Sequence, residues 1–133
     1  MMRSLAVLVG TVALAAGCGA RPTAPETSFP VTLTLQPGQT ASAGGLNLTF
    51  VGVSNDSRCP AAAICITSGE ATLQFGFATN TRAASQDLQL YHPDNRRTNY
   101  EGFTIEVETL APYPITFNSI RPADYRVTVK VDR

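Results

Sequence analysis

The stretch ATLQFGF, residues 71–77, decides the fold class of this 133-residue chain. Its large apolar side chains occupy every second position, and small or polar residues stand between them. Because successive side chains of a strand point to opposite faces, this pattern predicts a β-strand whose buried face carries Leu73, Phe75 and Phe77. A surface helix would instead repeat its apolar residues at spacings of three and four. The stretch therefore predicts a sheet that covers a core on one side.

Similar alternation recurs along the chain, and prolines and glycines separate the segments. The other expected strands are residues 31–35, 46–53, 88–90, 103–108 and 125–131. Gln36–Gln39 has Pro and Gly placed for a type II turn, and Gly52 suggests a bulge. No segment of ten or more residues after Cys18 has a helical period. About seven short strands predict an all-β fold, an antiparallel two-sheet sandwich, with a small β-barrel as the alternative.

The apolar positions of these strands form the predicted core. Its members are Val31, Leu33, Leu35, Leu48, Phe50, Leu73, Phe75, Phe77, Leu88, Leu90, Phe103, Ile105, Val107, Val127, Val129 and Val131.

The N-terminus has the features of a targeting segment. Arg3 precedes an apolar run, residues 5–16, that is too short to span a bilayer, which takes about 20 residues. This pattern predicts a secretory signal peptide. The run ends in Leu14-Ala15-Ala16-Gly17-Cys18, which resembles the lipobox of bacterial lipoproteins. The resemblance implies removal of residues 1–17 and lipidation of Cys18; an ordinary signal peptide followed by a free cysteine is the alternative.

Residues 18–30 are expected to be a lipidated cysteine and a proline-rich tether, with the β-sandwich domain at 31–133. Extended at about 3.1 Å per residue, residues 19–30 would reach roughly 30–35 Å. Stable anchoring needs more than one acyl chain, which the lipoprotein modification would supply. Gly19 after the cysteine favours the outer membrane in a Gram-negative cell, because inner-membrane retention resembles a rule for Asp at this position.

The other two cysteines, Cys59 and Cys65, lie between two predicted strands. Export would place them in an oxidising compartment, and five residues between them leave room for a loop. We therefore expect a structural disulfide. A metal site would want more ligands, and a redox pair more often has the CxxC spacing, so these remain the minor alternatives.

The segment Asp56-Ser57-Arg58-Cys59-Pro60, followed by Cys65 and by Gly69-Glu70-Ala71, resembles a small uncharacterised β domain of bacterial lipoproteins and secreted proteins. The segments 110–114 and 124–126 resemble its C-terminal half. The resemblance implies the fold and the disulfide, and it carries no catalytic residues. Arg58 is expected either to pair with a carboxylate such as Glu70 or to face solvent. These two residues are the possible binding loop.

Composition and charge narrow the function. Ten basic residues balance ten acidic ones, so nucleic acid is not an expected partner. No catalytic, cofactor-binding or metal-binding residues are predicted, and we expect no enzyme. The sequence favours a lipid-anchored protein of the bacterial cell envelope with a noncatalytic binding or structural domain. Its membrane contact would be the lipid anchor, and its partner an envelope protein or a cell-wall component. The alternative is an inhibitor of a lysozyme or a protease.

Overall fold

A computed structural model describes residue 19 and residues 26–133, and within them eight β-strands form two antiparallel sheets. The strands are β1 (Val31–Leu35), β2 (Thr40–Ala43), β3 (Leu46–Asp56), β4 (Ala71–Ala78), β5 (Ala83–Gln89), β6 (Arg97–Tyr100), β7 (Phe103–Ala111) and β8 (Arg126–Asp132), with a 3-10 turn η1 (Pro122–Asp124) before β8. The expected signal peptide and Cys18 lie outside the described residues.

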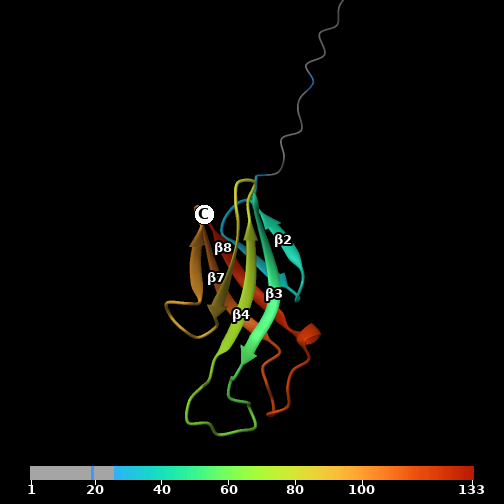
Figure 1. Ribbon diagram of the computed structural model, residues 1–133, viewed down its shortest axis with the longest axis vertical. Helices are drawn as coiled ribbons and strands as arrows, with labels where there is room; N and C mark the ends of the chain where they lie inside the picture. Colours follow the sequence, from blue (N-terminus) through green and yellow to red (C-terminus); the bar gives the residue numbers. More distant parts are fainter. Residues whose placement is uncertain (1–18, 20–25) are drawn as a thin grey trace, which may run out of the picture.

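Each sheet has four strands, in the orders β1-β8-β7-β6 and β2-β3-β4-β5. The two sheets form separate layers, with β3 and β4 in front of β7 and β8 in Figure 1. Because neither sheet closes on itself or on the other, the predicted sandwich is confirmed and the small barrel is wrong. The first strand pairs with the last, Val31 lying opposite Val131.

The β4 strand has the predicted faces. Leu73, Phe75 and Phe77 are buried, and Gln74 between them is exposed. Phe75 pairs with Phe50 of β3, and their ring centroids are 5.4 Å apart. The period-two pattern therefore predicted both the strand and its register relative to the core.

The buried core agrees with the predicted set at most positions. Val31 and Leu33 are only half-buried, because β1 lies at the edge of its sheet. Five residues of the hydrophobic core were not predicted: Ala43, Leu46, Ala71, Leu110 and Tyr125. Three of these stand at or beside the ends of the predicted strands.

The strands β2 and β6 were not predicted, and of β5 only its last two residues lie in the predicted strand 88–90. Each of them is the edge strand of its sheet. An edge strand buries little, so small and polar residues form it without a hydrophobic pattern. The β3 strand was predicted to end at Val53 but continues to Asp56, through register shifts that begin at the expected bulge near Gly52.

The long axis of the sandwich separates two ends with different contents. The described chain enters at the top of Figure 1, where the C-terminus also lies. There Phe29 packs edge-on against Phe103, with centroids 6.0 Å apart. At the bottom lie two long loops, which we call the disulfide loop (residues 57–70) and the proline loop (residues 112–121). We call this second end the loop end.

No helix in residue 19 or residues 26–133 has the length and apolar character needed to cross a membrane.

Candidate binding site at the loop end

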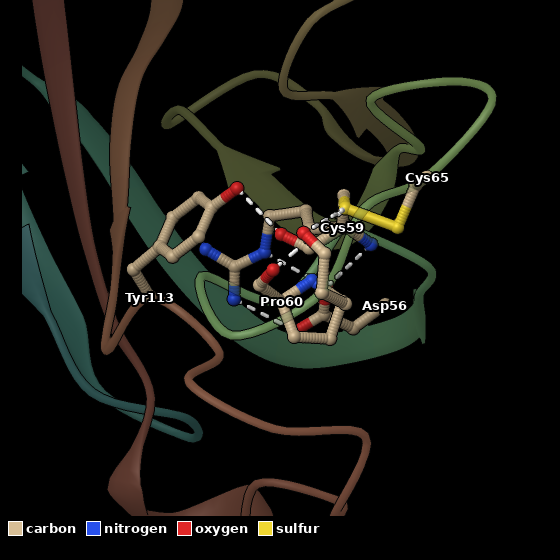
Figure 2. The surroundings of a disulfide bond; sticks show 7 residues. Asp56, Cys59, Pro60, Cys65 and Tyr113 are labelled. Atoms are coloured by element: carbon tan, nitrogen blue, oxygen red, sulfur yellow. Dashed lines mark hydrogen bonds and ion pairs between the residues drawn. A yellow bond between two sulfur atoms is a disulfide. The ribbon is translucent and has the colours of Figure 1, made fainter.

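The disulfide loop is closed by the predicted bond between Cys59 and Cys65, whose Cα atoms are 5.9 Å apart (Figure 2). Inside the loop, the N–H of Ala63 donates to the carbonyl of Pro60 at 3.0 Å. A bond that closes a loop of about seven residues stabilises the fold by about 2–2.5 kcal/mol in the chain-entropy model. The disulfide therefore restrains a segment that has no regular secondary structure of its own.

The base of the same loop is a narrow neck. The N–H of Ser57 donates to the carbonyl of Glu70 at 2.7 Å, and the Ser57 hydroxyl donates to the same carbonyl at 3.0 Å. Gly69 has φ +71°, and a Cβ there would collide with the carbonyl of Ser57. Only glycine permits so close an approach of the two limbs.

Arg58 joins the disulfide loop to the opposite sheet. Its guanidinium donates to both carboxylate oxygens of Asp56, at 2.8 and 2.7 Å, in the bidentate geometry that makes such pairs strong. It also donates to the carbonyls of Leu110 at 2.9 Å and Pro112 at 3.0 Å. Arg58 is 4% exposed. Arg58 therefore pairs with a carboxylate, as one of the two expectations had it, but that carboxylate is Asp56, two residues before it, and not Glu70.

Tyr125 completes this buried cluster. Its hydroxyl donates to Asp56 Oδ2 at 2.9 Å. Burial alone would raise the pKa of the Asp56 carboxyl, but the hydrogen bonds from Arg58 and Tyr125 outweigh burial and hold that pKa below its usual range. Burial and the bond to the carboxylate raise the pKa of Tyr125 to about 12. Asp56 is therefore charged, and Tyr125 neutral, over the whole physiological pH range.

Glu70, the second residue of the possible binding loop, has a different position. One of its carboxylate oxygens accepts the N–H of Ala71 at 2.8 Å and the N–H of Tyr91 at 2.9 Å. It thereby connects the start of β4 to the segment after β5. The structure does not bring Glu70 and Arg58 together as a pair.

Tyr113 ties the proline loop to the disulfide loop (Figure 2). Its hydroxyl donates to the carbonyl of Cys59 at 2.7 Å. Its ring lies against the Arg58 guanidinium, whose carbon is 5.5 Å from the ring centroid, which is a cation–π distance. The buried cluster of Asp56, Arg58 and Tyr125 thus extends into both loops.

Backbone hydrogen bonds also join the two loops. The N–H groups of Ala61 and Ala62 donate to the carbonyls of Pro114 and Ile115, each at 2.9 Å. Small alanine side chains let the two backbones approach this closely. The loops are therefore braced against each other, as well as against the sheets.

A cleft of about 620 Å³ lies between the two loops. Ile66 and Thr67 contribute from the disulfide loop and Phe117 and Ile120 from the proline loop, while the cluster around Asp56 also lines the cleft. A cleft of this volume is within the range of ligand-binding sites. Two loops separated in sequence by the whole of β4 to β7 thus form one concave surface.

Most of the exposed large apolar side chains lie on the two loops, and two of them, Ile66 and Phe117, line the cleft. Ile64 and Ile66 are fully exposed, and Phe117 is 81% exposed. Of the large hydrophobic residues exposed in the described chain, the two loops carry Ile64, Ile66, Tyr113, Ile115 and Phe117, and only Val51 and Tyr91 lie elsewhere. Residues 59–69 and 111–120 contain no Asp, Glu, Lys or Arg. An uncharged surface with several exposed apolar side chains is a candidate interaction site.

The acidic side chain of this site is bonded to its neighbours within the protein. In the part of the chain that the structure describes, no three His, Cys, Asp or Glu side chains come together as a metal site would require. The one carboxylate in the cleft, Asp56, already accepts hydrogen bonds on both oxygens, from Arg58 and Tyr125.

Several residues of this site were not identified from the sequence. The site residues predicted from the sequence do not include Tyr113, Ile115, Phe117 or Tyr125. Their sequence signal is the charge-free segment APYPITFNSI, residues 111–120, in which apolar residues occur without the alternation of a strand. Apolar side chains that no regular element can bury are candidates for a surface patch.

Comparison with known proteins finds no matching family model, no matching curated protein and no matching solved structure.

Proposed function

We propose that this protein is a lipid-anchored, noncatalytic binding protein of the bacterial cell envelope, with the loop end as its binding surface. Cys18 carries the lipid, residues 19–30 form the tether, and the outer membrane holds the anchor if the cell is Gram-negative. The observation that supports a binding role most directly is the gathering of exposed Ile64, Ile66, Ile115 and Phe117 on two braced loops. The disulfide fits an extracytoplasmic location.

The arrangement of the two ends supports the same proposal. The tether would join the sandwich at the end where Phe29 packs, whereas the apolar loops lie at the opposite end (Figure 1). The 11 residues of β3 separate the two ends by about 36 Å at 3.3 Å per residue. A protein anchored through Cys18 would therefore hold its binding surface away from its own membrane and toward a partner in the envelope.

The anchor is tested by replacing Cys18 with Ser in the full chain and following both proteins by detergent phase partitioning. The wild type should enter the detergent phase, because two or three acyl chains make release negligible. The Cys18→Ser protein should stay in the aqueous phase. A wild type that also stays in the aqueous phase would show that the chain has no lipid anchor.

The binding surface is tested with a photo-crosslinking amino acid placed at one exposed position at a time in the living cell. Ile66 lies on the disulfide loop, and Val51, 54% exposed on β3, is the matched control outside the loops. We expect a discrete crosslinked product from position 66 and none from position 51. Crosslinked products of equal yield at both positions would contradict a binding surface at the loop end. The absence of a product at both positions would contradict it as well.

An inhibitor of a lysozyme or protease is the second candidate. The disulfide loop presents two fully exposed isoleucines: Ile64 lies inside the ring that the Cys59–Cys65 bond closes, and Ile66 directly follows it. A rigid projecting loop of this kind can enter an enzyme cleft without a large loss of conformational entropy. Stoichiometric loss of lysozyme or protease activity on titration with the soluble domain, relieved by Ile66→Ser, would select this function instead.

A further inference from the structure

We infer that the cleft at the loop end receives an uncharged apolar side chain, aromatic or aliphatic, from a partner protein. The inference rests on the proposed binding function and specifies the chemistry of its partner. It rests on three observations: the balanced charges in the cleft, the hydrogen bonds already made by its charged groups, and the residues that line it.

The charged groups that line the cleft neutralise each other. Asp56 and Arg58 form a bidentate pair, and Tyr125 donates its proton to the same carboxylate. Arg58 also donates hydrogen bonds to two backbone carbonyls, and its side chain is 0% exposed. A charged ligand group would therefore find no counter-charge there, and an unpaired charge taken out of water costs several kcal/mol. The cleft selects for uncharged groups.

The walls and rim resemble the two zones of a protein interface. Ile66, Phe117 and Ile120 form apolar walls. Thr67 and Asn118 add uncharged polar groups that can bond a partner's backbone. Protein interfaces combine an apolar centre depleted of charge with a polar rim, and their strongest contacts are side chains buried in pockets. A small ligand inside the cleft would leave Ile64 and Ile115 in water, whereas a partner protein would cover them too.

Neither the leader of this chain nor its own membrane fits as the occupant. In the proposed mature chain, which begins at Cys18, ten residues lie between Cys18 and Phe29, which packs on the sandwich, and they would span about 31 Å when extended. The 11 residues of β3 already span about 36 Å, and the loops project beyond its end. The leader therefore does not reach the cleft. For the same reason, the domain cannot invert to push its loops into the leaflet that holds Cys18.

The test uses residues 19–133, which contain the whole described core from Leu35 to Val131 and lack the anchor. Phage-displayed random peptides are selected on this protein. We expect the selected peptides to share an aromatic or aliphatic anchor residue without charged neighbours. Ser119→Arg, which places a charge at the cleft, should weaken their binding about tenfold or more. Ser85→Arg, an exposed serine on β5, is the matched control and should change nothing.

Unchanged urea midpoints verify that both variants fold, and Thr67→Arg replaces Ser119→Arg if the latter does not. Peptides with a charged consensus, no enriched peptide, or binding that survives the arginine in the cleft would overturn the inference. The wild-type protein is also sedimented with phosphatidylcholine vesicles, with and without phosphatidylglycerol. If it sediments with them and Ser119→Arg does not, the cleft binds a lipid surface and the inference is overturned. Because the anchor is absent, failure of the lipidation proposal leaves this test unaffected, and a peptide result leaves the phase-partitioning result unaffected.

Discussion

Replacing Arg58 with Ala should destabilise the domain severely, even though Arg58 lies outside both hydrophobic sheet faces. The substitution leaves the Asp56 carboxylate, whose side chain is 13% exposed, without its bidentate partner. It also leaves the carbonyls of Leu110 and Pro112 without their donor. Removing one member of a buried ion pair costs about 3–5 kcal/mol. Since small domains are stable by about 5–15 kcal/mol, this loss is a large share of the total.

The measurement is urea unfolding of the soluble form, residues 19–133. With an m-value of about 1.5 kcal/mol/M, the midpoint of Arg58→Ala should fall by about 2–3 M. The chain contains its own control, since Arg121 and Asp124 form a bidentate pair at 2.8 and 3.0 Å in which Arg121 is exposed. Arg121→Ala should leave the midpoint almost unchanged, because water screens an exposed pair. Equal midpoints for the two variants would refute the structural role that we assign to Arg58.

The acid side of the stability curve gives an independent readout of the same pair. The pKa of Asp56 is depressed in the fold, so its contribution to stability is present above the unfolded pKa, about 3.9, and is lost as the pH falls through the folded pKa. Wild-type protein should therefore lose stability below about pH 4. In Arg58→Ala, burial is no longer offset by the arginine, and this acid loss should shrink. An acid loss of the same size in both proteins would mean that other carboxyl groups cause it.

Three further substitutions test the disulfide, the register and the buried tyrosine. Cys59→Ser with Cys65→Ser should leave a folded domain that melts lower, by about 4–8 °C for each kcal/mol lost, and two free thiols by mass spectrometry of non-reduced protein would contradict the bond. Phe75→Ala should cost about 3–5 kcal/mol in denaturant unfolding and Gln74→Ala less than about 0.5 kcal/mol, whereas similar losses would contradict the buried face of β4. The pKa of Tyr125 is raised to about 12 in the fold, so the stability that the neutral Tyr125 side chain contributes should be lost as the pH rises above its unfolded pKa, near 10. Tyr125→Phe should remove this alkaline loss of stability, and an unchanged loss in that variant would contradict the role of Tyr125.

The fold could be predicted from the sequence wherever a strand has one buried face. Alternating apolar residues predict both the strand and its buried face on β4 (Leu73, Phe75 and Phe77) and on β8 (Val127, Val129 and Val131). Of the edge strands, β1 alternates and was predicted, whereas β2, β5 and β6 have no such pattern; β5, for example, exposes five consecutive residues from Ala83 to Asp87. Their positions depend on pairing with an adjacent strand, and the local sequence pattern does not show which strand that is.

The candidate site was predictable only in part, for a similar reason. The disulfide could be predicted because the two cysteines are close in sequence and an export signal is expected. The partners of Arg58 could not, since the carbonyls of Leu110 and Pro112 lie 52 and 54 residues further along the chain. The resemblance to a lipoprotein domain, like the anchor at Cys18, remains a prediction.

The pairing of β1 with β8 has a consequence for how this protein folds. Val31 meets Val131, and all five residues of β1 pair with the last strand. Contacts between residues so distant in sequence slow folding, because a long chain must be ordered before they form. One four-strand sheet therefore stays incomplete until residues 126–132 have been synthesised. A chain that stops before Arg126 keeps β1 and β7 as open edges, and such unpaired edges expose incomplete chains to aggregation and to proteases.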